Sequence, residues 1–181
     1  METEYEVRFL DINIEGIENK LKKIGAKKRY DNPFKIRAFF ANGDDDKDFI
    51  RIRDEGDKIT LCHKKTQTGS IVAEEYEIEV DDFEKAHEFL KSLNYREKVY
   101  AEKRRIHYVL DNFSIDIDIW PLIPPFVEIE GEDEEHIKQI CQRLDFDYND
   151  AHKGDAFDVY REYGIEPNRY KILSLDKQVL K

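Results

Sequence analysis

The N-terminal segment TEYEVRFL alternates between charged and apolar side chains. Its charged positions are Glu4, Glu6 and Arg8, and apolar residues fill the positions between them. A period of two predicts a β-strand with one ionic and one apolar face. The ionic face could point to water, which is the common arrangement. It could also point into a closed interior, where charges are costly unless partners or a ligand accompany them.

Six later segments repeat this alternation, at residues 49–53, 58–64, 74–80, 101–110, 113–119 and 127–130. One parity of each segment is apolar, whereas the other carries long charged side chains. The charged positions are Arg51, Arg53, Lys64, Glu75, Glu77, Lys103, Arg105, Asp116, Asp118, Glu128 and Glu130. Any one such strand is typical of a half-solvated antiparallel sheet with cross-strand ion pairs. Agreement among seven strands favours a sheet whose ionic faces are gathered on one side.

Apolar residues at helical spacing predict helices within the segments 11–28, 81–95, 133–144 and 155–164. Gly25 and Gly164 are expected to end the first and last of these, and Asp81 or Asp82 to cap the second. The chain then consists of a strand, a helix, about four strands, a helix, three strands and a helix. Many consecutive strands joined by short turns predict an α+β fold with a curled or closed antiparallel sheet.

The remaining segments give local predictions. The extended segment 27–40 is expected to break at Asn32–Pro33, and the HKGD segment at 152–155 is expected to be a solvated turn. We expect one domain over residues 1–165, followed by a tail, residues 166–181, of unassigned structure.

Composition narrows the functional classes. The net charge of −11 argues against a general nucleic-acid-binding protein, so we expect no nucleic acid duplex as a partner. The two cysteines, Cys62 and Cys141, are too few and too far apart for a disulfide framework, which favours a cytoplasmic protein. The N-terminus is acidic and no run approaches about 18 apolar residues, so we expect neither a signal peptide nor a membrane span.

A closed sheet would turn the gathered charges into the lining of a tunnel. Guanidinium and ammonium groups hold phosphate oxygens. Carboxylates hold Mg²⁺ or Mn²⁺, and the ion bridges the same phosphates and reduces repulsion among the carboxylates. The chain has no G-x-x-x-x-G-K-[ST] motif, so a P-loop is not the phosphate cradle. The pattern favours a polyanion bound together with divalent cations.

A family resemblance runs through seven ordered segments: EYEVRF, IRIR, TLCHKK, EEYEIEV, EKRRIHY, SIDID and FVEIEG. They resemble motifs of the CYTH superfamily, the triphosphate tunnel metalloenzymes, and EYEVRF is similar to its E-x-E-x-K signature. The resemblance spans Glu4 to about Tyr163. It implies a closed eight-stranded antiparallel β-barrel, the triphosphate tunnel, with both ends accessible and helices packed outside. Class IV adenylate cyclases, thiamine triphosphatases, inorganic triphosphatases and fungal-type RNA triphosphatases belong to this superfamily.

The resemblance also implies roles for individual residues. The ligands of Mg²⁺ or Mn²⁺ would be Glu4, Glu6, Asp118, Glu128 and Glu130. The triphosphate would be held by Arg51, Arg53, Lys64, Lys103 and Arg105. Arg8 and Lys64 would take part in catalysis, and the site would be supported by Glu75, Glu77 and Asp116. Asp116 and Asp118 share one face, so the choice of metal ligand between them stays open.

The implied function is a divalent-metal-dependent enzyme that hydrolyses inorganic triphosphate, thiamine triphosphate or a nucleoside triphosphate. One alternative is a class IV adenylate cyclase, which makes cyclic AMP and pyrophosphate from ATP. Another is a non-catalytic binder of polyphosphate or nucleotide, because Arg8 stands where lysine is usual and arginine does not release a proton. The expected partner is a triphosphate-bearing small molecule, and a homodimer stays open.

Overall fold

The protein folds around a closed antiparallel β-barrel, as the sequence predicted. The computed structural model describes the backbone of residues 2–181 and the side chains of residues 5–181. Eight strands follow one another around the barrel in the order β6-β2-β3-β4-β5-β1-β8-β7, and β7 pairs again with β6 to close it. The strands are β1 (Glu2–Phe9), β2 (Lys27–Phe40), β3 (Asp48–Asp54), β4 (Ile59–Lys65), β5 (Val72–Val80), β6 (Glu97–Leu110), β7 (Phe113–Ile119) and β8 (Phe126–Gly131).

Four helices surround the barrel at the places where helical spacing predicted them. They are α1 (Ile14–Lys23), α2 (Phe83–Ser92), α3 (Glu134–Arg143) and α4 (Ala156–Glu162), and two short 3₁₀ helices are η1 (Tyr148–Asp150) and η2 (Pro167–Arg169). Each α-helix begins at a side-chain cap, namely Asn13, Asp82, Asp133 and Asp155. These caps satisfy backbone N–H groups that the first helical turn leaves without partners. No helix in the described part of the chain is long and apolar enough to cross a membrane.

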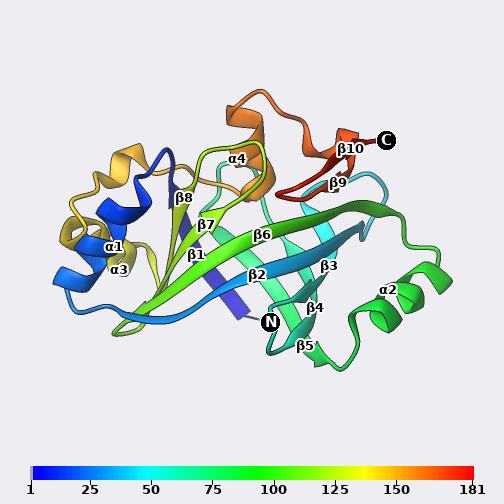
Figure 1. Cartoon of the computed structure of the whole chain (residues 1–181), viewed down its shortest axis with the longest axis horizontal. Coiled ribbons are helices and arrows are strands. Elements are labelled where there is room, and N and C mark those ends of the chain that lie inside the picture. Colours follow the sequence, from blue (N-terminus) through cyan, green and yellow to red (C-terminus); the bar gives the residue numbers. More distant parts are fainter. Residues whose placement is uncertain (1) are drawn as a thin grey trace.

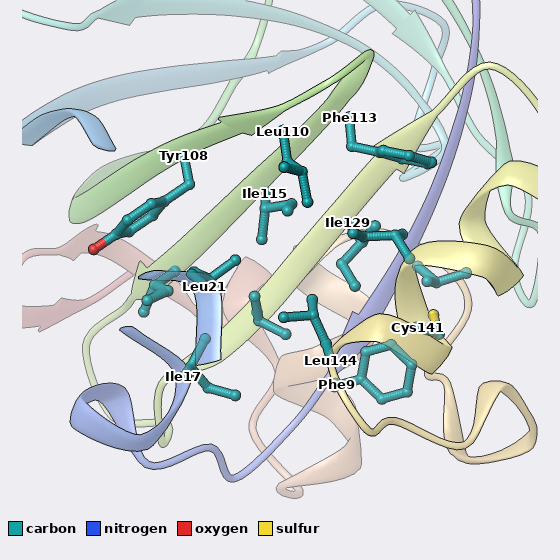
Figure 2. Close-up of a cluster of buried hydrophobic side chains, with 14 of the residues drawn as sticks. Phe9, Ile17, Leu21, Tyr108, Leu110, Phe113, Ile115, Ile129, Cys141 and Leu144 are labelled. Atoms are coloured by element: carbon teal, nitrogen blue, oxygen red, sulfur yellow. The ribbon is translucent and has the colours of Figure 1, made fainter. Parts of the chain in front are cut away.

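The largest core lies between the outer face of the barrel and the helices α1 and α3. Val7 of β1 pairs with Ile129 of β8, and both are fully buried. Ile17 and Leu21 of α1 pack in the same cluster (Figure 2), and Ile137 of α3 belongs to it as well. Burial of each such side chain stabilises the fold by about 1.5–3 kcal/mol. The apolar parity therefore faces outward, which turns the charged parity toward the barrel interior.

The predicted break in the second extended segment is wrong, because β2 continues through Asn32–Pro33. Pro33 lies opposite Arg104 of β6, so one edge of β2 is paired there. The pairing with β3 extends only as far as Lys35, which lies opposite Asp54. At Pro33 the other edge of β2 therefore has no partner strand, and a residue without an N–H group is tolerated at such an edge.

The C-terminal residues add two strands to the sheet. The strand β9 (Tyr170–Leu173) runs parallel to β6 and pairs with it at Tyr100 and Ala101, and β10 (Gln178–Leu180) pairs with β9. The pairing of β6 with β7 begins only at Arg104, so β9 occupies the edge of β6 that β7 leaves open. Figure 1 shows β9 and β10 beside α4, away from α1 and α3.

The helix α4 packs across one end of the barrel, where the family resemblance implied an open mouth, and we call this the covered end. Its buried residues Val159 and Tyr160 pack in one cluster with Ile36 and Ala38 of β2. Ile36 and Ala38 lie opposite Arg53 and Arg51 in the sheet, and residues paired in this way share a face. The helix therefore packs against the inner face of the barrel wall.

Candidate active site

A cavity of approximately 610 Å³ occupies the barrel interior. Its lining contains most of the charged positions that the sequence pattern singled out. They are Glu6 and Arg8 of β1, Arg51 and Arg53 of β3, Lys64 of β4, Glu75 and Glu77 of β5, Lys103 and Arg105 of β6, Asp116 and Asp118 of β7, and Glu128 and Glu130 of β8. The side chain of Glu4, expected as a metal ligand, lies outside the residues whose side chains are described. The structure thus brings the expected basic and acidic groups into one space.

Arg8 joins two of the expected metal ligands. One nitrogen of its guanidinium, Nη2, lies 3.1 Å from Glu6 Oε2 and 2.5 Å from Glu128 Oε2. The two carboxylate oxygens therefore converge on a single point inside the barrel. Arg8 is only 3% exposed, and its other terminal nitrogen, Nη1, donates to the carbonyl oxygen of Gly154. Burial alone would lower the pKa of Arg8, but Glu128 and Glu6 outweigh it and raise the pKa.

Arg105 binds carboxylates on two strands. Its Nε and Nη2 atoms donate to the two oxygens of Asp118, each at 2.7 Å. Its Nη1 lies 2.6 Å from Asp116, and Nη2 also reaches Glu128 at 2.8 Å. Both aspartates therefore contact Arg105, whereas Asp118 alone also accepts a hydrogen bond from Lys103, at 2.7 Å. Burial would raise the pKa of Asp118, but the charges of Arg105 and Lys103 lower it.

Among Arg8, Lys103 and Arg105, only Lys103 has a lowered pKa. Burial, and then repulsion by Arg105, lower its pKa to about 8 despite the attraction of Asp118. The ammonium group also lies 5.1 Å from the ring centre of Trp120 and 5.5 Å from that of Phe34. Aromatic faces attract a cation, so these rings stabilise the charged form.

The opposite wall of the cavity carries a second set of ion pairs. Lys64 lies 2.5 Å from Glu75 and 3.6 Å from Glu6. Arg51 lies 3.4 Å from Glu77, which also receives Arg53 at 3.5 Å. Burial would raise the pKa of Glu75, but Arg51 and Lys64 outweigh it and lower the pKa to about 2.

The alternation of inward and outward side chains along β4 distinguishes Lys64 from Lys65. The side chain of Lys64 is 8% exposed inside the barrel, whereas that of Lys65 is 54% exposed outside it. The buried Glu55 was missed, although it pairs with Arg53 at 2.6 Å. Glu55 continues the parity of Arg53, but it lies beyond the end of β3 at Asp54, where the strand alternation no longer applies.

The carboxylates of the cavity suit a divalent cation in their chemistry. Oxygen donors are the ligands that Mg²⁺ and Mn²⁺ prefer, and Glu6 and Glu128 already converge on one positive group. Among the residues with described side chains, one set of three potential donor atoms lies within 4.8 Å of one another, on Cys62, Glu75 and Glu77. Burial raises the pKa of the Cys62 thiol to about 12, which makes it a poor ligand.

The segment before α4 reaches the site and is not the solvated turn that the sequence suggested. The backbone of His152 exchanges hydrogen bonds of 3.0 and 2.8 Å with that of Arg8. Gly154, which accepts from Arg8, is buried and has a φ of +118°. A Cβ atom at this position would lie 2.3 Å from Oδ2 of Asp158, so both the backbone and the space require glycine.

Lys98 is a further buried cation that sequence reasoning missed. It is 2% exposed, and its ammonium group lies about 5 Å from the ring centres of Phe40, Phe49 and Phe157. It donates to the carbonyl oxygen of Asp46 at 3.0 Å and lies 3.3 Å from the Asp46 carboxylate. The pairing of β6 with β2 shifts register beside Lys98, so alternation could not predict that it points inward.

Comparisons with known proteins agree with this architecture. A model of the CYTH domain matches residues 2–156. The PH1012 protein from Pyrococcus horikoshii has a TM-score of 0.73 at 24% identity, covering 82% of this chain and 94% of that chain. A candidate adenylate cyclase from Vibrio parahaemolyticus has a TM-score of 0.74 at 14% identity, covering 88% and 98%.

A third solved structure is that of a candidate adenylyl cyclase from Hippeastrum, described as revealing a dominant triphosphatase activity. Its TM-score is 0.60 at 14% identity, covering 93% of this chain and 99% of that chain. At these identities the likeness of the solved structures shows the fold alone. No curated protein matches the chain.

Proposed function

The chain belongs to the CYTH domain family, and from this premise we propose that it hydrolyses a triphosphate with the help of Mg²⁺ or Mn²⁺. The observation that carries the proposal is the gathering of buried and partly buried cations around one cavity. These cations are Arg51, Arg53, Lys64, Lys103 and Arg105. The cavity volume of approximately 610 Å³ falls within the ~300–1,000 Å³ typical of small-molecule sites.

The ion pairs of the cavity explain how a phosphate chain would be bound. Burying a charge is costly unless it is paired, so the protein pairs each cation with carboxylates. A phosphate chain offers oxygens that can replace those carboxylates. Arg105 already holds Asp118 through two parallel hydrogen bonds, and a guanidinium binds phosphate in the same bidentate manner. The released carboxylates are then available for a divalent cation.

Each group has a distinct part in the proposed reaction. Glu6 and Glu128 would hold a divalent cation together with Asp118, Glu130 and Glu4. The bound cation supplies charge neutralisation and lowers the pKa of water. Lys64, Lys103 and Arg105 bind the phosphate oxygens and stabilise the negative charge that develops on the leaving group. Arg8 keeps its proton, so it orients carboxylates and does not act as a base.

A turnover assay tests this proposal. The full chain is incubated with Mg²⁺ or Mn²⁺ and with tripolyphosphate, ATP or thiamine triphosphate, and the products are separated by chromatography. We expect inorganic phosphate. Cyclic AMP and pyrophosphate from ATP would identify a class IV adenylate cyclase instead. Ligand binding without turnover, seen as thermal stabilisation, would identify a non-catalytic binder.

A matched pair of variants tests the site itself. We expect Lys64→Ala to weaken tripolyphosphate binding by roughly 10- to 100-fold, the effect of one charge-assisted hydrogen bond. Lys65→Ala removes the same charge from the outer surface and is expected to bind as the wild type does. Equal binding by both variants, or the absence of turnover and binding with every ligand, would overturn the proposed function.

A further inference from the structure

We propose that the end of the cavity opposite α4 holds a subsite for a planar heteroaromatic group, formed by Tyr30 of β2 and His107 of β6. The subsite would bind the organic group of a triphosphate monoester. The inference rests on the proposed function, because it assumes that the cations deeper in the barrel hold the triphosphate. It adds the substrate class, which the charged lining alone does not specify.

At the covered end, residues of α4 and the segment before it occupy the space next to the cavity. Tyr160 of α4 is fully buried and donates a hydrogen bond of 2.8 Å to the carbonyl oxygen of Pro121. Asp155, at the cap of α4, lies 2.9 Å from Lys47 in the loop between β2 and β3. Phe157 also lines the cavity at this end. We therefore expect a bulky group attached to the phosphates to extend toward the opposite end.

The lining becomes exposed at the opposite end. The side chain of Lys58, which follows the turn after β3, is 43% exposed, and that of Glu77 is 30% exposed. Both residues line the cavity, as do Tyr30 and His107. Tyr30 and His107 are thus placed between the cations of the cavity and the solvent, where the organic group of a triphosphate monoester would lie.

Tyr30 and His107 form a fixed aromatic surface. The two residues are paired in the sheet, and their rings stack with centroids 4.8 Å apart and an interplanar angle of 22°. His107 Nδ1 lies 2.7 Å from Asp116 Oδ1, which sets the orientation of the ring. Asp116 is in turn held by Arg105 at 2.6 Å. A preorganised aromatic pair loses little conformational entropy when a planar ligand stacks on it.

The same residues offer hydrogen-bonding groups that the protein leaves unused. Within the described part of the chain, neither the Tyr30 hydroxyl nor His107 Nε2 has a hydrogen-bond partner. Burial, and then the charge of Asp116, raise the pKa of Tyr30, so its hydroxyl remains a neutral donor. Heteroaromatic rings present both a face for stacking and edge nitrogens or amino groups for hydrogen bonds.

The aromatic character continues inward along β2. Phe34 shares the inner face with Tyr30, and their ring centroids lie 6.0 Å apart. The ring of Phe34 also lies beneath three cations, with its centroid 5.8 Å from Arg53, 5.5 Å from Lys103 and 5.8 Å from Arg105. The inner face of β2 therefore leads from the cations proposed to bind phosphate to the aromatic surface. This order matches the order of groups in a triphosphate monoester.

Binding measurements with and without an organic group test the inference. Dissociation constants for ATP, thiamine triphosphate and tripolyphosphate are measured by calorimetry in EDTA, where no turnover occurs. We expect Tyr30→Leu to weaken the binding of ATP, of thiamine triphosphate or of both by about 10-fold or more. Tripolyphosphate, which has no ring, should bind as it does to the wild type. The ligand whose affinity falls identifies the organic group.

Two further variants exclude a general structural effect. Tyr30→Phe keeps the stacking face, so it should lose less affinity than Tyr30→Leu. Tyr95→Leu makes the same exchange in the cluster beneath α2, outside the barrel, and should change no affinity. If Tyr30→Leu leaves all three dissociation constants unchanged, the subsite is wrong while the phosphate site stands. If tripolyphosphate does not bind the wild type in EDTA, and is neither bound nor hydrolysed with Mg²⁺ or Mn²⁺, the proposed function fails and the subsite fails with it.

Discussion

Replacing Arg8 by lysine tests whether this residue joins the barrel interior to the segment before α4. The guanidinium of Arg8 contacts Glu6, Glu128 and the carbonyl oxygen of Gly154. Lysine keeps a positive charge beside the two carboxylates. Its single ammonium group, however, cannot reproduce a planar fork that spans three partners. We therefore expect the Gly154 carbonyl to lose its donor in Arg8→Lys.

The expected cost follows from the kind of contact that is lost. A hydrogen bond from a charged donor contributes about 1.5–3 kcal/mol, and the acceptor here lies on a buried residue. We therefore expect Arg8→Lys to lower the free energy of unfolding by about 2 kcal/mol. In a chain of 181 residues, this corresponds to a fall in melting temperature of roughly 4–8 °C.

Urea unfolding at pH 7 measures this loss, with Arg29→Lys as a control at an exposed position of β2. The control should change the free energy of unfolding by less than about 0.5 kcal/mol. Amide hydrogen exchange at residues 152–156 should be faster in Arg8→Lys, because the segment is no longer held at Gly154. A variant as stable as the wild type, with unchanged exchange, would refute the reasoning.

The same variant separates two roles in turnover of tripolyphosphate. If Arg8 only orients carboxylates and phosphates, Arg8→Lys should mainly alter KM. A large rise in kcat at constant KM would show that a lysine at this position activates the nucleophile.

Two further predictions concern stability. Asp46→Ala removes the carboxylate beside the buried ammonium group of Lys98. We expect the free energy of unfolding in urea to fall by about 2–4 kcal/mol, because an unpaired buried charge is costly. An unchanged urea midpoint would contradict this role of Asp46. The pKa of Glu75 is lowered to about 2 in the folded protein beside Arg51 and Lys64. Its stabilising contribution is therefore fully present above about pH 4.5, the ordinary pKa range of a glutamate, and is lost as the pH falls toward 2. Urea midpoints at pH 7, 5 and 3 should therefore fall mainly below pH 5, and Glu75→Gln should flatten that fall.

The barrel and most of its lining could be predicted because a strand that alternates charged and apolar residues can be placed in only two ways. Either its charged face or its apolar face points into the barrel. In β6, Ile106 and Tyr108 face the outer core, so Lys103, Arg105 and His107 must face inward. A slip of one residue would exchange the two sets and place charges in an apolar core, which is too costly to occur. Seven strands under the same constraint specify the sign and position of the interior charges without any knowledge of distances.

Other features depend on contacts that alternation does not describe. The partner of Arg8 at Gly154 is 146 residues away in the sequence, and no local pattern links them. Lys98 points inward because of a register shift. Pro33 stays within a strand because the neighbouring strand β3 has already ended there. Each depends on where one chain segment stops relative to another, which is a property of the assembled fold.

The position of α4 has a consequence for the order of events in a catalytic cycle. If the proposed reaction takes place in the cavity, substrate and products would pass through the end opposite α4, because α4 packs across the other end. With the organic group at that opening and the terminal phosphate inside, the organic fragment must depart before the inner phosphate can. Phosphate that lingers then blocks the next substrate. Inorganic phosphate should therefore inhibit the enzyme competitively with respect to the triphosphate.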